Sequence, residues 1–147
     1  MSQRASISNR LSEDAIRCCL KKRAHRIVGE DDRVRVVEEV QVDGGRARID
    51  MLFVGEFTVG IEIKSAQDSL SRLPTQSEAY SRYFDYLILA TDEKFVRKAL
   101  EILPEWWGVA CVLHTGTRLA LRQVRRAKPN PELNAEFCRF RTGRRRQ

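Results

Sequence analysis

Long hydrophobic runs are absent from this sequence, which argues against a helical membrane protein. A helix that crosses a bilayer needs about 20 consecutive apolar residues, and no stretch here approaches that length. The first ten residues also lack the apolar stretch of a secretory signal peptide. We therefore expect a cytoplasmic protein that has no membrane partner.

Cysteine and histidine are scarce, and their positions exclude the common sites built from them. The four cysteines are Cys18, Cys19, Cys111 and Cys138, and the two histidines are His25 and His114. No C-x-x-C pair is present, so the usual spacing of a zinc site is missing. We expect neither a disulfide framework nor histidine-based nuclease chemistry.

Positive charge is present in excess, and it is concentrated near the C-terminus. The net charge is +7, and the segment from Arg122 onward holds nine Lys/Arg against two Asp/Glu. Such a segment favours a polyanion, usually nucleic acid, although a solubilising tail would look the same. We predict that Arg125 and Arg126 contact nucleic acid, and that a flexible basic tail begins at about residue 141.

The 147 residues suit a single domain of the α/β class. Helices are predicted over residues 12–26, 74–83 and 92–103, with a short one near residues 133–137, and strands over residues 34–42, 46–54, 57–64, 86–91, 107–113 and 118–124. The first three strands follow one another and should be antiparallel. The fourth follows a crossover helix and should pair in parallel. This order predicts a three-layer αβα arrangement around a central mixed β-sheet.

A charged pair on an otherwise apolar strand is the first candidate for chemistry. Side chains alternate along a strand, so Glu62 and Lys64 share one face while Ile61 and Ile63 point into the core. Charges in such a place must be solvated, paired or bound to a metal. An ordinary surface ion pair is the simplest alternative.

Asp50 lies on the preceding strand and can join this pair only if the connecting loop has the right length. A three-residue loop, Gly55 to Phe57, pairs Val54 with Thr58 and brings Asp50 opposite Glu62. A two-residue loop would turn Asp50 to the other face. The proposed site therefore requires the longer loop, or a bulge, which Gly55 permits.

Two neighbouring carboxylates repel each other unless a cation lies between them. Asp50 and Glu62 are predicted to hold Mg²⁺ or Mn²⁺, with the Ile63 carbonyl as a further ligand, since hard cations prefer oxygen. Lys64 is then placed to orient a water or to neutralise a transition state. Glu13, on the inward face of the first helix, can add a carboxylate, and Glu38 or Glu39 compete for that role.

Four polar residues follow the charged strand. Gln76 and Tyr80 are spaced i, i+4 on the next helix, so they share a face that can support the site, or simply form a half-buried helix face. Ser69 and Arg72 supply a hydroxyl and a guanidinium near the same strand end, where they are predicted to contact a phosphate.

Together these residues resemble the PD-(D/E)XK nuclease superfamily. The carrying motifs are Arg48-Ile49-Asp50, Glu62-Ile63-Lys64 and Gln76-x-x-x-Tyr80, and the stretch EIKSAQDSLSRLPTQSEAYSRYFD is similar to the bacterial and phage family called sce7726.

The resemblance implies a restriction-endonuclease-like fold with an αβββαβ core and Mg²⁺- or Mn²⁺-dependent hydrolysis of phosphodiesters, in DNA more than in RNA. It also implies that Asp50 and Glu62 hold metal, that Lys64 is catalytic, and that Glu13, Gln76 and Tyr80 support them. A non-catalytic nucleic-acid-binding module that kept the fold is the alternative. A homodimer is compatible with the sequence, which does not mark an interface.

Overall fold

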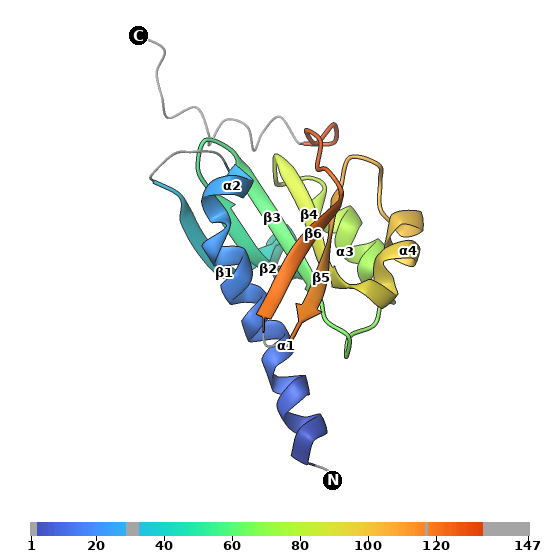
Figure 1. Cartoon of the computed structure of the whole chain (residues 1–147). Helices are drawn as coiled ribbons and strands as arrows, with labels where there is room; N and C mark the ends of the chain where they lie inside the picture. Colours follow the sequence, from blue (N-terminus) through green and yellow to red (C-terminus); the bar gives the residue numbers. More distant parts are fainter. Residues whose placement is uncertain (1–2, 29–32, 117, 134–147) are drawn as a thin grey trace.

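The computed structural model describes residues 3–28, 33–116 and 118–133 (Figure 1). The helices are α1 (Gln3–Lys22), α2 (Ala24–Val28), α3 (Leu73–Tyr80) and α4 (Glu93–Ile102), and a 3-10 turn covers Asp43–Gly45. The strands are β1 (Arg35–Val42), β2 (Ala47–Val54), β3 (Thr58–Lys64), β4 (Tyr86–Asp92), β5 (Gly108–Thr115) and β6 (Arg118–Arg125). The predicted order of helices and strands is confirmed.

All six strands form one mixed sheet in the order β1-β2-β3-β4-β5-β6. The pairs β1–β2, β2–β3 and β5–β6 are antiparallel, whereas β3–β4 and β4–β5 are parallel. The parallel pairing of β3 with β4 was predicted from the crossover through α3. The central position of β3 and β4 explains why their side chains are buried on both faces.

Helices cover the sheet on both faces and make a three-layer α/β arrangement (Figure 1). One apolar cluster packs α1 and α2 onto the sheet through Ile16, Leu20, Ala24 and Val28. The other packs α3 and α4 onto the opposite face and includes Leu73, Tyr80, Ala99 and Leu103.

The structure differs from the expected elements mainly at the ends of the chain. α1 begins at Gln3, earlier than predicted, and the helical segment is divided near Arg23, with α2 starting at Ala24. The short helix expected near residues 133–137 and the basic tail from residue 141 lie outside the described residues. Among the helices that are described, none is both long and apolar enough to cross a membrane.

Candidate functional site

Glu62 and Lys64 lie at the end of β3, side by side and buried. They are 3% and 4% exposed, and the Lys64 Nζ lies 3.5 Å from Glu62 Oε1. A pair so removed from water is not an ordinary surface ion pair, so that alternative is wrong. Strand alternation was therefore a sound guide to this part of the site.

Helix α3 holds the Glu62 carboxylate from the side. The Gln76 amide Nε2 donates to Glu62 Oε1 at 3.1 Å, and the Tyr80 hydroxyl lies 3.2 Å from Oε2. The same hydroxyl lies 2.7 Å from the carbonyl oxygen of Arg48, which connects α3 to β2 as well. The predicted common face of Gln76 and Tyr80 is confirmed, and it is directed at Glu62.

Asp50 is brought in by the predicted three-residue loop. Val54 pairs with Thr58, and the ladder between β2 and β3 runs as far as Met51 with Ile61. At the next residue, the Asp50 side chain takes the place of a backbone carbonyl as the hydrogen-bond acceptor: the amide N–H of Ile63 donates to Asp50 Oδ2 at 2.7 Å. The amide of Ile63 thus contacts Asp50, while its carbonyl as a metal ligand remains a prediction.

The β1–β2 ladder is interrupted beside Asp50. Glu39 has a φ of 57°, and Glu39 and Asp50 are both left out of the ladder, although the register is the same on either side: Glu38 pairs with Met51 and Val40 with Ile49. Across this interruption the strands exchange faces: Ile49 packs under α3, whereas Met51 packs under α1. The positive φ of Glu39 is a local distortion of the strand, since a non-glycine residue rarely adopts it.

Arg17 of α1 occupies the centre of the acidic group that results. Its Nη2 lies 2.8 Å from Glu13 Oε1, 2.6 Å from Glu39 Oε1 and 3.4 Å from Asp50 Oδ1. Its Nη1 lies 3.3 Å from Glu38 Oε1 and donates to the Asp50 carbonyl at 3.2 Å. Arg17 was not predicted from the sequence, although its i, i+4 spacing from Glu13 was a usable signal.

Burial dominates the electrostatics of the two central carboxylates. It raises the pKa of Glu62 to about 8, assisted by the negative charge of Asp50 and opposed by Lys64 and Tyr80. The pKa of Asp50 is also raised by burial, against the opposing effects of the Ile63 amide and Arg17. Without a bound cation, Glu62 therefore holds its proton at neutral pH.

Carboxylate oxygens of Glu13, Glu39 and Asp50 lie within 4.8 Å of one another, a spacing that suits a cation with oxygen ligands. Glu13 of α1 and Glu39, which was predicted as an alternative to Glu13 for the additional carboxylate, are therefore both part of the group. Glu62 is not a member of it, since its carboxylate is held by α3. The donor set fits a hard divalent cation, provided that Arg17 moves aside.

The residues predicted to contact nucleic acid are more scattered. Ser69 lies 2.8 Å from the Ser71 hydroxyl in an exposed loop, and Arg72 is the exposed residue that precedes α3. Arg125 donates to the carbonyls of Trp107 and Pro104 at 2.8 and 2.9 Å, so its guanidinium braces the loop before β5. Arg126 is exposed, away from Glu62 and Lys64.

Comparison with known proteins finds no match among the curated ones. A solved structure of a protein of unknown function from Silicibacter pomeroyi is similar, with a TM-score of 0.55 and 19% sequence identity, over 87% of this chain and 76% of that one. At this identity the likeness concerns the fold alone. The family described as Bacteriophage P4 protein cII matches residues 7–139, a span that includes Glu13, Asp50, Glu62 and Lys64. The chain therefore belongs to the bacteriophage P4 protein cII family.

Proposed function

We propose that this protein is a metal-dependent nuclease that hydrolyses phosphodiester bonds, with DNA as the expected substrate and a fold of the restriction-endonuclease-like type. The observation that carries the proposal is the buried Glu62–Lys64 pair, braced by Gln76 and Tyr80. Burying two ionisable groups costs stability, and a purely structural position would be better filled by apolar residues. Perturbed carboxyl groups of this kind cluster at functional sites.

Each residue has a defined part in this proposal. Asp50 and Glu62 would hold the cation, with Glu13 or Glu39 as a further ligand; since Glu62 lies outside the group of Glu13, Glu39 and Asp50, its carboxylate would have to move toward Asp50 when the cation binds. Mg²⁺ or Mn²⁺, when bound, would lower the pKa of water and stabilise charge on the phosphodiester. Lys64 positions the attacking water and offsets negative charge in the transition state. Gln76 and Tyr80 are positioning residues, because they fix the orientation of the Glu62 carboxylate.

Cleavage of single-stranded, duplex and branched DNA, and of RNA, in Mg²⁺ or Mn²⁺ tests the proposal. Lys64→Met, which keeps the volume of the side chain, should lower the rate by about 100-fold or more. Lys98→Met is the matched control, since Lys98 is an exposed lysine on α4. Activity that survives in folded Lys64→Met and Asp50→Asn proteins would refute this site.

A second candidate is a non-catalytic nucleic-acid-binding module that retains the fold. The position of Arg17 favours it, because one guanidinium lies within 3.4 Å of oxygens from Glu13, Glu39 and Asp50. An arginine there supplies the positive charge that a metal would bring. A protein that keeps Arg17 in place would bind no cation and would cleave nothing.

Calorimetric titration with Mn²⁺ separates the two candidates. If Arg17 only competes with the cation, wild type binds Mn²⁺ and Arg17→Ala binds it about tenfold more tightly, since a full charge has been removed at contact distance. If Arg17 permanently occupies the position of the cation, the wild-type protein binds no Mn²⁺ at any concentration, and only the Arg17→Ala protein binds it. Arg97→Ala, on the exposed side of α4, should behave as wild type.

A further inference from the structure

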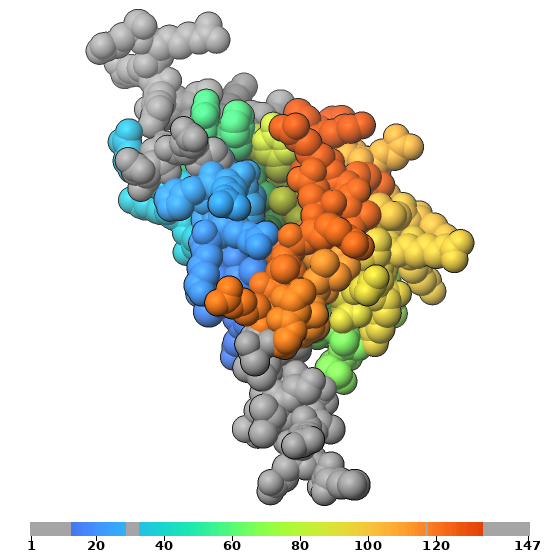
Figure 2. Space-filling view, in the orientation of Figure 1, coloured from blue at the N-terminus to red at the C-terminus, as the bar shows by residue number. Residues whose placement is uncertain are grey.

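A groove lies on the α1–α2 side of the sheet, away from the acidic group. It has a volume of about 610 Å³ and is lined by α1, α2, the strands β3 to β6 and the residues just after β6. Figure 2 shows this face hollowed between the blue helices and the orange-red β6, with the green and yellow of β3 and β4 behind. At its floor Tyr86, Ile88 and Ala110 are half-buried, so the described helices cover this part of the sheet only in part.

The groove is separate from the candidate nuclease site. Its floor includes Val59 at the start of β3, whereas Lys64 ends the same strand. Five residues of strand rise by about 17 Å. Val59 also belongs to the α1–α2 side, while Glu62 is held from the opposite side by α3. A ligand in the groove therefore has its own contacts.

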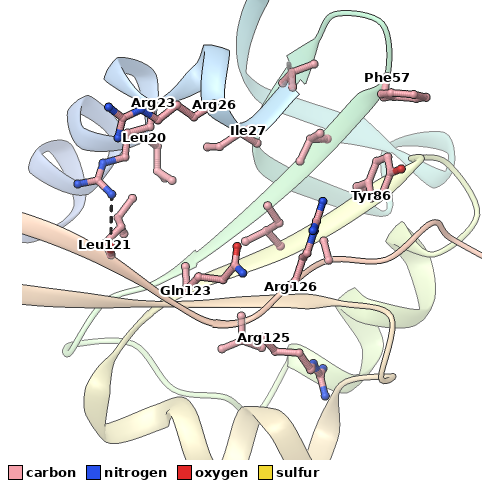
Figure 3. A pocket seen from close by; sticks show the side chains of 17 residues that line it. Leu20, Arg23, Arg26, Ile27, Phe57, Tyr86, Leu121, Gln123, Arg125 and Arg126 are labelled. Carbon is pink, nitrogen blue, oxygen red and sulfur yellow. Dashed lines mark hydrogen bonds between the residues drawn. The ribbon is translucent and has the colours of Figure 1, made fainter. Parts of the chain in front are cut away.

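The lining is basic. It includes Arg23, Arg26, Arg125 and Arg126, and none of its described lining residues is acidic. Arg125 points to the other side of the strands in Figure 3, where it donates to Trp107 and Pro104. The Arg23 Nη1 donates a hydrogen bond to the Leu121 carbonyl at 3.2 Å. The side chains of Arg26 and Arg126 are exposed. The groove thus fits an anion, which excludes the chain's own basic C-terminal segment as its occupant.

The interior suits a flat, partly apolar group. Phe57, 38% exposed, meets Tyr86 edge to face with ring centroids 5.6 Å apart at the groove wall. Ile88, half-buried on β4, adds apolar surface, and Figure 3 shows Gln123 directed into the space, with an amide that both donates and accepts. Unpaired bases and their phosphates are bound by groups of these kinds: an aromatic ring for stacking, an amide and a basic rim.

We propose that this groove binds an unpaired nucleotide within single-stranded nucleic acid. The base lies against Phe57 and Tyr86, and the adjoining phosphates lie on Arg26 and Arg126. A paired base is enclosed in its stack and cannot enter, so duplex binds less well. The site does not depend on hydrolysis, and it operates whether or not the acidic group binds a cation.

Fluorescence anisotropy with a labelled 12-nucleotide thymidine strand, in EDTA and over a range of salt, tests the proposal on the full chain. Arg126→Ala and Arg26→Ala should each weaken binding about fivefold and lower the salt slope by about 0.7. Phe57→Ala should weaken it about tenfold through lost stacking. Arg97→Ala, an exposed arginine on α4, is the matched control and should bind as wild type.

Photocrosslinking identifies the contact independently of affinity. A strand that carries 5-iodouracil should crosslink in the peptides that contain Phe57 or Tyr86, and crosslinks confined to the C-terminal segment would overturn the proposal. Unchanged binding in the Arg26, Arg126 and Phe57 variants would do the same. The proposal would also be overturned if polyglutamate, duplex DNA or thymidine monophosphate displaced the labelled strand as effectively as the unlabelled strand does. Because EDTA removes the metal, failure here leaves the nuclease proposal standing.

Discussion

Glu62 is a carboxyl group that its surroundings keep protonated at neutral pH. It is 3% exposed, and burial together with Asp50 raises its pKa to about 8. A protonated carboxyl can donate a hydrogen bond as well as accept one.

The raised pKa of Glu62 predicts how stability varies with pH in metal-free protein. The unfolded chain loses this proton near its ordinary pKa of 4.5, while the folded chain keeps it to about pH 8. The free energy of unfolding should therefore fall as pH rises between these values, by at most about 1.4 kcal/mol per pH unit, and level off above. Urea unfolding in EDTA from pH 5 to 8.5 measures this slope.

Glu62→Gln should remove most of that slope, since the amide has no proton to lose. The exposed Glu101→Gln on α4 is the matched control and should keep the wild-type profile. Parallel profiles for wild type and Glu62→Gln would show that Glu62 titrates normally. Asp50, whose pKa is also raised, adds a residual slope of the same sign.

At the scale of elements, the contact between β3 and the α3 side depends on a glycine. A Cβ at Gly60 would lie 2.6 Å from Ile49 Cδ1, 2.8 Å from Leu87 Cδ2 and 3.0 Å from Phe84 Cδ2. All three neighbours are buried in one cluster and have little room to move. Gly60 thus lets β3 approach the layer that contains Gln76 and Tyr80.

Gly60→Ala should lower the free energy of unfolding by about 1–3 kcal/mol through overpacking. Ile49→Val removes the nearest atom, Cδ1, and on its own should cost about 0.5–1.5 kcal/mol. The double variant should cost less than the sum, because the valine leaves space for the new methyl group. Urea unfolding of the four proteins measures the coupling, and strictly additive costs would contradict the contact.

At the scale of the whole molecule, the segment after β6 returns across the sheet and fastens to the α3–β4 connection. The Asn130 Nδ2 donates to the carbonyls of Ser81 and Phe84 at 2.7 and 2.8 Å, and the Asn130 amide donates to the Asp85 carbonyl. This connection joins the last described residues to the middle of the chain.

Asn130→Ala should lower the free energy of unfolding by about 1–3 kcal/mol, because two carbonyls lose their donor. Asn130→Asp should be no better, since a carboxylate cannot donate to them. Lys128→Ala is the matched control, as its side chain is exposed on the same segment. Thermal unfolding measures the effect, and limited proteolysis should show earlier cleavage after β6. Equal stability of all three variants would mean that the segment is held elsewhere.

The sequence by itself determined the strands, the loop between β2 and β3, and the shared face of Glu62 and Lys64. These features depend on local rules: alternation in strands, spacing in helices and the length of a short loop. Because such rules need no knowledge of distant contacts, spacing alone placed Gln76 and Tyr80 on one face of α3, whereas the contact of that face with Glu62 came from the structure.

Only the tertiary structure decided which charges meet. β1 and β2 exchange faces where their ladder is interrupted at Glu39 and Asp50, and these two residues meet Arg17 of α1, 22 and 33 residues away in sequence. The groove likewise arises from α2, β3, β4 and β6 together. Neither follows from periodicity, since both depend on how the helices cover the sheet and where they leave it open.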